Sequence, residues 1–490
     1  MFRSRNRIPR IPRCHTLAGI DLWAGTNGFG RMAPTFLSRI ASPGAVSIQL
    51  LLPMDIEGLV TPPPPPPKEG RKYDLIVFGA SGYTGRLTCE QVLANTPSTL
   101  KWAIAGRSPN KLELLALEYN KRFPDRVPVG IFIANVENED TLETMARVTR
   151  VLITTVGPYL KYGTPVLEAC ALNGTHYVDA TVETTWVREM IKKYHKTATV
   201  NGAVIIPQCG VQSAPADLAA HSLVSLIRNR LSCPTDNITF TLLDHVSGVS
   251  GGTVETLLSV WEIATLQEMF HARRTYSLSP IKGLDLPFIP PIQQHEDLGV
   301  LTKNVQASHD EKVVMRSWGL NQGGEWYGRN FMFREYRSVE TMFMAVWMYI
   351  WMSMIQILPY VTPVRWIIRR YYAPPLGEGP ILESTNKYRI EWRGVAEADD
   401  DNEEAAKATI SILCEKDTYT TTGILLVQTA MSLLSDEETF AKKTGGGVLT
   451  PSAAASPALF MALDRYQRRV EKGSMLLYWT RARTGWAGKG

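Results

Sequence analysis

Between residues 73 and 210, six short apolar runs alternate with segments in which apolar residues recur every three or four positions. Apolar runs bounded by charge, glycine or proline are typical of buried parallel strands, and the intervening periodicity predicts helices. This alternation predicts a Rossmann-type, doubly wound parallel sheet, which is an α/β fold. We expect its strands within 75–78, 100–108, 129–136, 151–159, 176–181 and 203–210.

The pattern changes after residue 236. The segments 237–246, 386–398 and 407–417 predict strands, and the last two alternate as strands do when one face is solvated. A glycine entry into an amphipathic helix at 250–266 and a capped helix at 456–473 complete the second half. We therefore expect a second, mixed α+β domain that serves substrate binding or formation of a homodimer.

These patterns divide the chain into four parts. We expect an extension over 1–72, an NAD(P)-binding Rossmann domain over 73–218, a second α+β domain over 219–450, and a C-terminal helix and tail over 451–490.

A glycine-rich turn, "GASGYTGR", follows the first predicted strand. Gly79, Gly82 and Gly85 remove Cβ atoms from the point where a strand turns into a helix, and the free N–H groups of that helix can bind an anion. The spacing is G-x-x-G-x-x-G, and the turn follows the first strand, where this fold binds the pyrophosphate of a dinucleotide. The sequence therefore predicts a dinucleotide site.

The end of the second predicted strand distinguishes between the two nicotinamide dinucleotides. An NAD site is expected to carry Asp or Glu there to bind the ribose 2′-hydroxyl, whereas this chain has Gly106, Arg107 and Ser108. A guanidinium and a hydroxyl suit a 2′-phosphate. We expect NADP (NADPH) as the cofactor; the alternative is that Arg107 is a solvated surface residue.

One segment of the second half, 341–364, contains no charged residue. Its length could span a bilayer, and three arginines with three aromatic residues follow it directly, as at a membrane interface. It could be a core helix, a helix on a membrane surface, or a full span. Because predicted strands flank it on both sides, we favour a surface helix whose following arginines contact headgroup phosphates.

Charge is distributed unevenly along the chain. Residues 1–72 hold ten Lys and Arg against four Asp and Glu, whereas the remainder holds 42 against 43. The folded part has no basic excess, which argues against nucleic acid as a ligand. The acid-free, arginine-rich start resembles a mitochondrial transit peptide, but Pro9 and Pro12 would break the helix that such peptides form. We interpret 1–72, with its proline run, as a disordered basic extension, with mitochondrial targeting as the alternative.

The six cysteines are scattered along the chain. They form no C-x-x-C pair and have no histidine at metal-ligand spacing. We therefore expect reduced, mostly buried thiols in an intracellular protein, and no metal site.

Several motifs in order resemble the saccharopine dehydrogenase-like oxidoreductases. These are "GASGYTGR", "AIAGRS", "TTVGPYLKYGTPVLEAC" and "GTHYVDAT", with "SGGT", "GEGP" and "GGGVLTP" in the second half. The likeness runs from about residue 73 to the C-terminus. It is closer to the branch with trans-acting enoyl reductases and lipid-droplet-associated relatives than to the lysine-pathway enzymes.

The resemblance implies roles for particular residues. The turn would hold the pyrophosphate, the end of the second strand the adenosine phosphate, the end of the third strand the adenine, and the end of the fourth strand would line the nicotinamide. The implied cofactor-binding residues are Gly79, Ser81, Gly82, Tyr83, Thr84, Gly85, Arg107, Ser108, Asn135, Val136, Gly157, Pro158 and Tyr159.

The chain departs from the family pattern near the substrate side. Where the family often has G-[FY]-D-S-x-P-S-D, residues 210–217 read "GVQSAPAD", and the family's T-G-E reads "TVE" at 181–183. No catalytic residue is evident; Tyr159, Asp179 and Glu183 are candidates by position alone. The departures leave the substrate and the activity open, but they do not change the expected fold of the cofactor-binding domain.

The resulting hypothesis is an NADP-dependent oxidoreductase that acts on a hydrophobic, lipid-linked substrate at the surface of a lipid droplet or the endoplasmic reticulum. Two other classes stay open: a catalytically silent dinucleotide-binding redox sensor, which Gln212 favours, and a membrane or lipid-droplet scaffold protein.

Overall fold

The computed structural model describes residues 68, 70–245, 248–284, 290–382, 388–399, 406–435, 439–453 and 476–478. All of them belong to one compact unit of the chain, Pro62–Gly490. Most of the expected N-terminal extension and the helix expected at 456–473 lie outside the described residues.

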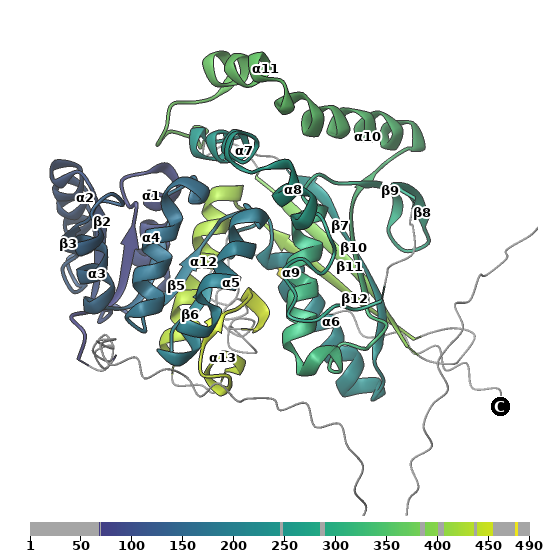
Figure 1. The fold of residues 1–490 in the computed structure, drawn as a ribbon, viewed down its shortest axis with the longest axis horizontal. Helices are drawn as coiled ribbons and strands as arrows, with labels where there is room; N and C mark the ends of the chain where they lie inside the picture. The colour runs from purple at the N-terminus through teal and green to yellow at the C-terminus, as the bar shows by residue number, and fades with distance from the viewer. Residues whose placement is uncertain are drawn as a thin grey trace, which may run out of the picture. The chain divides into compact units, whose positions relative to one another are not determined.

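Sheet A is a parallel sheet of seven strands in the order β13-β6-β5-β4-β1-β2-β3 (Figure 1). The Rossmann-type fold class and all six expected strands are confirmed. The strands are β1 (Tyr73–Phe78), β2 (Trp102–Gly106), β3 (Gly130–Ile133), β4 (Thr149–Thr154), β5 (His176–Asp179), β6 (Val204–Ile206) and β13 (Gly447–Val448). The chain order reverses between β1 and β4, which makes that point the switch at which this fold binds ligands.

Both faces of sheet A are covered. In β1, Leu75 and Val77 belong to one apolar cluster and Ile76 and Phe78 to another, because successive side chains of a strand point to opposite faces. The helices that follow the strands are α1 (Tyr83–Asn95), α2 (Pro109–Arg122), α3 (Glu139–Val148), α4 (Tyr159–Leu172), α5 (Thr184–Val200) and α6 (Ala214–Leu231).

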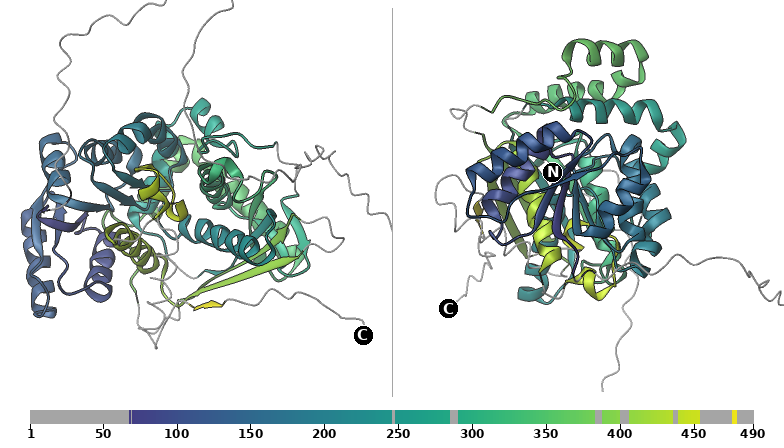
Figure 2. Two further views of the ribbon diagram at one scale, coloured as in Figure 1. Left: turned by 90° about the horizontal axis from the view of Figure 1, so that it is seen from below. Right: turned by 90° about the vertical axis from the view of Figure 1, so that its left-hand side faces the viewer.

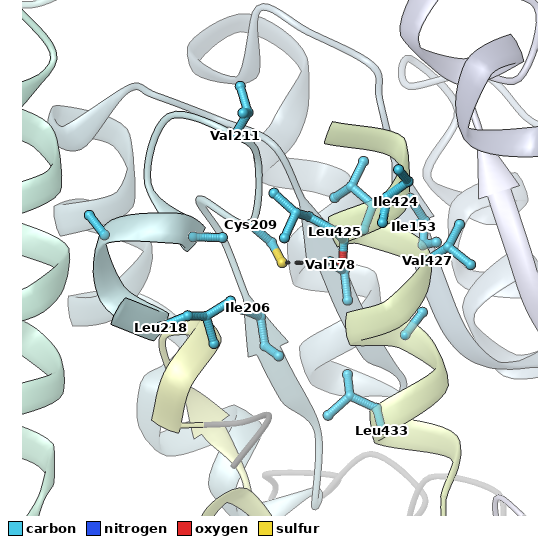
Figure 3. Close-up of a cluster of buried hydrophobic side chains, with 14 of the residues drawn as sticks. Ile153, Val178, Ile206, Cys209, Val211, Leu218, Ile424, Leu425, Val427 and Leu433 are labelled. Carbon is cyan, nitrogen blue, oxygen red and sulfur yellow. Dashed lines mark hydrogen bonds between the residues drawn. The ribbon is translucent and has the colours of Figure 1, made fainter. Parts of the chain in front are cut away.

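Two segments from the far end of the chain also belong to sheet A. Strand β13 pairs with β6, and α12 (Thr418–Leu434) packs on α1, β4 and β5. Figure 3 shows Ile424 and Leu425 of α12 facing Ile153 and Val178 of the sheet. The sequence pattern placed both segments with the second half, because neither carries a local signal of its distant partner. Two short helices flank this region: α13 (Phe440–Lys443) and a turn of helix at 451–453.

Sheet B is the mixed sheet expected for the second half. Its order is β14-β12-β11-β7-β10-β9-β8, with β10 parallel to β7 and the other pairs antiparallel. Helices α6 and α9 (Ala307–Leu320) pack on it. The strands are β7 (Thr235–His245), β8 (Ile292–His295), β9 (Gly299–Lys303), β10 (Met332–Val339), β11 (Ile390–Ala398), β12 (Lys407–Cys414) and β14 (Leu476–Tyr478). The last of these, inside the expected C-terminal helix and tail, was not predicted.

A helical layer lies beside sheet B (Figure 1, Figure 2). Helix α10 contacts β9 and β10, and the ring of Tyr360 lies 4.1 Å from that of Trp261 in α7. Arg369 forms ion pairs with Glu255 and Glu262 of α7, at 2.9 and 3.0 Å. The elements of this layer are α7 (Gly251–Ile263), α8 (Leu266–Ala272), α10 (Met342–Ile357), η2 (Leu358–Tyr360), α11 (Thr362–Ile367) and η3 (Ile368–Tyr372), whereas η1 (Gln322–Gly324) follows α9 and packs on it.

The folded part begins before Tyr73. Arg71 donates hydrogen bonds to the Thr149 carbonyl and the Thr175 hydroxyl, each at 2.7 Å, and also to the Asn173 carbonyl. Lys68 donates to the Gly202 carbonyl at 2.6 Å. The expectation that all of 1–72 stands outside the fold is therefore corrected at its C-terminal end, where cationic side chains bind carbonyls at the amino edge of sheet A.

The described cysteines are mostly buried, as the sequence analysis expected. Cys89, Cys170, Cys209 and Cys414 are buried and Cys233 is half-buried. Burial raises the pKa of the Cys209 thiol to about 12. These thiols pack as small apolar side chains.

Candidate functional site

The residues expected to bind a dinucleotide meet at the carboxyl edge of sheet A. Phe78 pairs with Ala105 of β2 and with Thr154 of β4, and Thr154 pairs with Asp179 of β5. The loops after these strands therefore emerge side by side. The register brings together the glycine turn, the 107–108 pair, the 135–136 pair and the 157–159 segment, as the sequence predicted.

The glycine turn requires its glycines. Gly79 has φ of +88°, and a Cβ there would lie 2.8 Å from the Thr155 hydroxyl oxygen. A Cβ on Gly85 would lie 2.1 Å from the Gly79 carbonyl oxygen, so α1 can approach β1 only because Gly85 has no side chain. Gly82 is the N-cap of α1, and no side chain caps that end of the helix. Its first backbone N–H groups are therefore available to an anion.

The side chain of Tyr83 contacts a segment from the second half of the chain. Its hydroxyl donates to the Pro380 carbonyl at 2.7 Å, and a Cβ on Gly379 would lie 2.6 Å from its ring. The "GEGP" segment is thereby held against the start of α1. Because the side chain is engaged there, Tyr83 can contact a bound anion only through its backbone N–H. Ser81 and Thr84, its neighbours in the turn, are half-buried.

Arg107 and Ser108 lie where the sequence placed them, directly after β2. Arg107 is exposed, and Ser108 is the N-cap residue of α2, although its side chain makes no capping hydrogen bond. The exposed guanidinium and the free hydroxyl stand beside the turn at the next strand. This arrangement suits a ribose 2′-phosphate.

Replacing Arg107 with alanine is expected to weaken NADPH binding by about 10- to 150-fold and to leave NADH binding nearly unchanged. The reason is that a charge-assisted hydrogen bond to phosphate contributes roughly 1.5–3 kcal/mol, and only NADPH carries the 2′-phosphate. Fluorescence titration with both cofactors measures the effect. Equal losses for the two cofactors would show that Arg107 supports the fold instead.

Asn135 and Val136 follow β3 and are both half-buried. The Asn135 side chain accepts from the backbone N–H of Glu137 at 3.4 Å, and its carbonyl accepts from the N–H of Asn138 at 3.0 Å. A tight turn therefore leads into α3. The position suits the expected contact with adenine, which stays a prediction.

The 157–159 segment brings the second half of the chain to the site. The Gly157–Pro158 bond is cis, and Pro158 is the N-cap of α4. A Cβ on Gly157 would lie 3.5 Å from the hydroxyl of Thr256 in α7. An ion pair between Lys161 and Glu255, at 3.0 Å, joins α4 to α7 beside it. The helix that begins with "SGGT" therefore borders the expected nicotinamide side.

The three candidate acids are buried and engaged. The Asp179 carboxylate accepts from the Tyr177 hydroxyl at 2.6 Å and from the N–H groups of Thr181 and Gln208, and burial raises its pKa to about 6. The Tyr159 hydroxyl donates to the Thr154 carbonyl at 3.2 Å, and burial raises its pKa. These contacts assign both residues to the architecture of the β4 and β5 ends.

Glu183 holds the start of α4. Its carboxylate accepts hydrogen bonds from the backbone N–H groups of Tyr159, at 2.9 Å, and of Leu160. Burial raises its pKa to about 7, while those two donors act in the opposite direction. A carboxylate from α5 thus caps a helix that has no side-chain cap of its own.

The departing motif at 210–217 is likewise bound into the fold. The Ser213 hydroxyl donates to Asp310 of α9 at 3.2 Å. Asp217 accepts from the Ser317 hydroxyl at 2.5 Å and from the Ser452 N–H at 2.8 Å. Its retained serine and aspartate therefore join α6 to α9 and to the turn of helix at 451–453. Gln212 is half-buried beside them.

Sequence reasoning missed two residues at this edge. The Tyr419 hydroxyl, on α12, accepts from the Ser250 N–H at 2.6 Å and lies 3.0 Å from the Thr253 hydroxyl; its ring packs edge-on against that of Tyr83. Gln208 has φ of +61°, and its buried Nε2 has no hydrogen-bond partner among the described residues. Few non-glycine residues adopt the left-handed region, and those that do are often found at ligand sites. Neither property has a signature in the local sequence.

The residues present fit NADP. A Cβ-free cradle lies at the N-terminus of an uncapped helix, and it stands at the switch point of the sheet. An arginine takes the place of the carboxylate that would repel a 2′-phosphate.

Comparison with known proteins agrees with this geometry. Residues 75–206 match the saccharopine dehydrogenase NADP-binding domain. The trans-acting enoyl reductase of Mycobacterium tuberculosis is 30% identical over 431 residues, which cover 80% of this chain and 96% of that protein. The protein of the same name from Mycobacterium leprae is 29% identical over 419 residues, with the same coverage.

Among solved structures, apo saccharopine dehydrogenase (L-Glu forming) from Saccharomyces cerevisiae aligns over 84% of this chain and 100% of its own, with a TM-score of 0.47 and 11% identity. At this similarity the yeast structure adds no support to the fold, which follows from the strand order. The cofactor is NADP. The chain belongs to the saccharopine dehydrogenase-like oxidoreductases, together with the trans-acting enoyl reductases.

Proposed function

We propose that this NADP-dependent oxidoreductase transfers hydride to or from a hydrophobic, lipid-linked substrate at the surface of a membrane or lipid droplet. NADP supplies the hydride chemistry when it is bound; the chain supplies the binding, the orientation and the site of action. The enoyl reductase names belong to the mycobacterial relatives, and the substrate of this chain is argued from its own surface. The observation that carries the proposal is the uncovered apolar helix α10.

Helix α10 exposes large apolar side chains along its length. Phe343, Trp347 and Trp351 are 80%, 64% and 54% exposed, and within α10, all of whose residues are described, only Ala345 is buried. Met342–Tyr360 is long and apolar enough to cross a membrane, yet only 11% of its apolar 18-residue stretch is buried. Exposed apolar area costs about 25 cal/mol per Å² in water, so a cover of lipid or protein is favourable. This exposure argues against the core-helix alternative.

The connections of α10 support surface attachment over a full span. Strand β10 leads directly into the helix, and the chain returns at Glu378, whose carbonyl accepts from the Gly251 N–H at 3.1 Å. The Pro380 carbonyl then binds Tyr83 at the cofactor turn. Both ends of the segment thus contact the same folded unit, whereas a span would place its two ends on opposite sides of a bilayer.

We expected all three arginines after α10 to contact lipid headgroups, but two of them bind groups of the protein itself. Arg365 donates to the Pro359 carbonyl at 2.6 Å and lies 3.7 Å from Glu262. Arg369 pairs with Glu255 and Glu262 of α7. Those two guanidinium groups hold α11 and η3 on α7, because acidic residues outside the local sequence compete for them. Arg370, stacked on the exposed Tyr371 ring, is left to face an interface.

Flotation with lipid vesicles tests the site of action. Replacing Trp347, Ile350, Trp351 and Ile355 with serine is expected to lower the vesicle-bound fraction at least about tenfold, because the apolar area that enters the lipid is lost. NADPH affinity should be unchanged.

The matched control replaces Leu114 and Leu117 of α2, which are 68% and 69% exposed, with serine and should leave binding intact. A wild-type protein that stays soluble with vesicles present would contradict surface attachment.

Incubation with NADPH and a lipid extract, followed by mass spectrometry, tests the chemistry. A lipid that changes by the mass of the transferred hydrogens supports hydride transfer to a lipid, and NADPH consumption without such a product contradicts it.

A further inference from the structure

A cavity of about 1190 Å³ lies beside α9 and sheet B. None of the residues expected to bind the dinucleotide lines it. Its walls come from α5, the segment after α8, the Lys303 end of β9, α9, β10 and, through Tyr349, from α10. Its volume slightly exceeds that of common small-molecule sites.

The walls of this cavity are strongly cationic. Seven lysines and arginines line it against two glutamates. Arg188 pairs with Glu189, at 3.3 Å, but within the described part of the chain Arg273, Lys303 and Arg334 form no ion pair with a carboxylate. Like charges that face one enclosed space repel each other unless an anion lies among them.

The two glutamates of the cavity are too few to balance its seven lysines and arginines. Burial and the adjoining Asp310 raise the pKa of Glu335 well above its ordinary value, and burial raises that of Glu311. Glu335 is 3% exposed, and its Oε2 has no hydrogen-bond partner among the described residues. The cavity therefore keeps an excess of cationic side chains with both glutamates included.

Lys312 adds a buried cation to the same wall. It is 4% exposed and donates to the Ser308 hydroxyl at 2.7 Å. Ser308, Glu311 and Lys312 share one side of α9 because they are three and four residues apart. The adjoining His309 contacts Thr184, the first residue of α5, at 2.7 Å. Helix α9 therefore joins the wall of the cavity to the start of α5, which follows β5 of sheet A.

We propose that this cavity binds a phosphate ester, with the phosphate held by the cationic wall and the organic body in the remaining volume. Guanidinium groups bind phosphate in a bidentate manner, and an ammonium group contributes a point charge. The position of Tyr349 on exposed α10 makes a phospholipid headgroup one source of this chemistry, and a soluble phosphate ester is the other. The inference depends on the cavity and not on hydride transfer.

The test uses the full chain saturated with NADPH, so that the dinucleotide site cannot bind the probes. Calorimetry with glycerol 3-phosphate and flotation with phosphatidic acid vesicles measure the two sources, with glycerol and phosphatidylcholine vesicles as uncharged or zwitterionic controls. Replacing Arg273 and Lys303, both exposed, with serine is expected to weaken binding about tenfold or more. Arg334 is half-buried and lies on β10, and Arg334→Gln should also weaken binding of the probes.

The matched control replaces Lys111 and Lys121, exposed lysines of α2, with serine and should leave probe binding unchanged. The proposal is supported if the protein binds either probe and the cavity variants weaken that binding. If the cavity variants weaken binding to phosphatidic acid vesicles but not to glycerol 3-phosphate, the lipid headgroup is the source. Absence of binding by both probes, or binding that the cavity variants leave unchanged, overturns it. NADPH affinity, measured in the same samples, separates this outcome from a failure of the cofactor site.

Discussion

Replacing Gly85 with alanine is expected to weaken NADPH binding by about 100-fold or more and to lower the free energy of unfolding by about 3 kcal/mol. The new Cβ would lie 2.1 Å from the Gly79 carbonyl oxygen, 2.8 Å from the Gly79 carbonyl carbon and 2.9 Å from the Ala80 Cα. All three are backbone atoms of the turn, which no rotamer change can move. Helix α1 must therefore shift away from β1, and its N–H groups move with it.

Calorimetric titration with NADPH and denaturant unfolding measure the two effects. Gly252→Ala is the matched control, because a Cβ there would lie 3.8 Å from the Ser250 hydroxyl oxygen and alanine is the better helix former. That variant should be neutral or slightly more stable. An unchanged NADPH affinity in Gly85→Ala would show that the dinucleotide does not use this turn.

Replacing Glu183 with glutamine is expected to lower the free energy of unfolding by about 3 kcal/mol at acidic pH. The side chain is 1% exposed and accepts from the N–H groups of both Tyr159 and Leu160. At acidic pH the carboxyl is protonated, yet its hydroxyl oxygen can still accept a hydrogen bond, whereas a glutamine offers one carbonyl oxygen and turns an NH₂ group, which accepts none, toward the second donor. One N–H of α4 would then be buried without a partner.

The pH dependence of this difference has a definite sign. The pKa of Glu183 is raised from 4.5 to about 7 by burial, so its stabilising contribution is fully present below about pH 4.5 and is lost as the pH rises through about 7. The difference between wild type and Glu183→Gln should therefore shrink over that window. Urea unfolding at several pH values measures it.

Glu189→Gln is the matched control for Glu183. Glu189 lies on the same helix, is 37% exposed at its side chain and pairs only with Arg188 and Lys192 among the described residues. Exposed pairs contribute about 0.2–1 kcal/mol. A Glu183→Gln variant no less stable than this control would contradict the capping role.

Much of the candidate site could be predicted because its signals are local. The 75–78 run has neighbouring side chains that enter opposite cores, so its uniform apolarity already indicated a buried parallel strand. The glycine turn and Arg107 lie within a few residues of strand ends, and parallel pairing brings such ends to one edge. The roles of Tyr83, Glu183 and Arg369 could not be predicted, since each is set by a partner from another segment.

The sequence by itself determined the six strands and their places along the chain, the glycine turn after the first of them and the expectation of NADP as the cofactor, because each depends on residues that are neighbours along the chain. Only the tertiary structure decided that β13 completes sheet A and α12 covers it, that Glu183 caps α4, and that cations gather around the cavity beside α9. It also decided that α10 is left uncovered. These features depend on which distant segments share one core, and burial and charge compensation are properties of that packing rather than of any single stretch of chain.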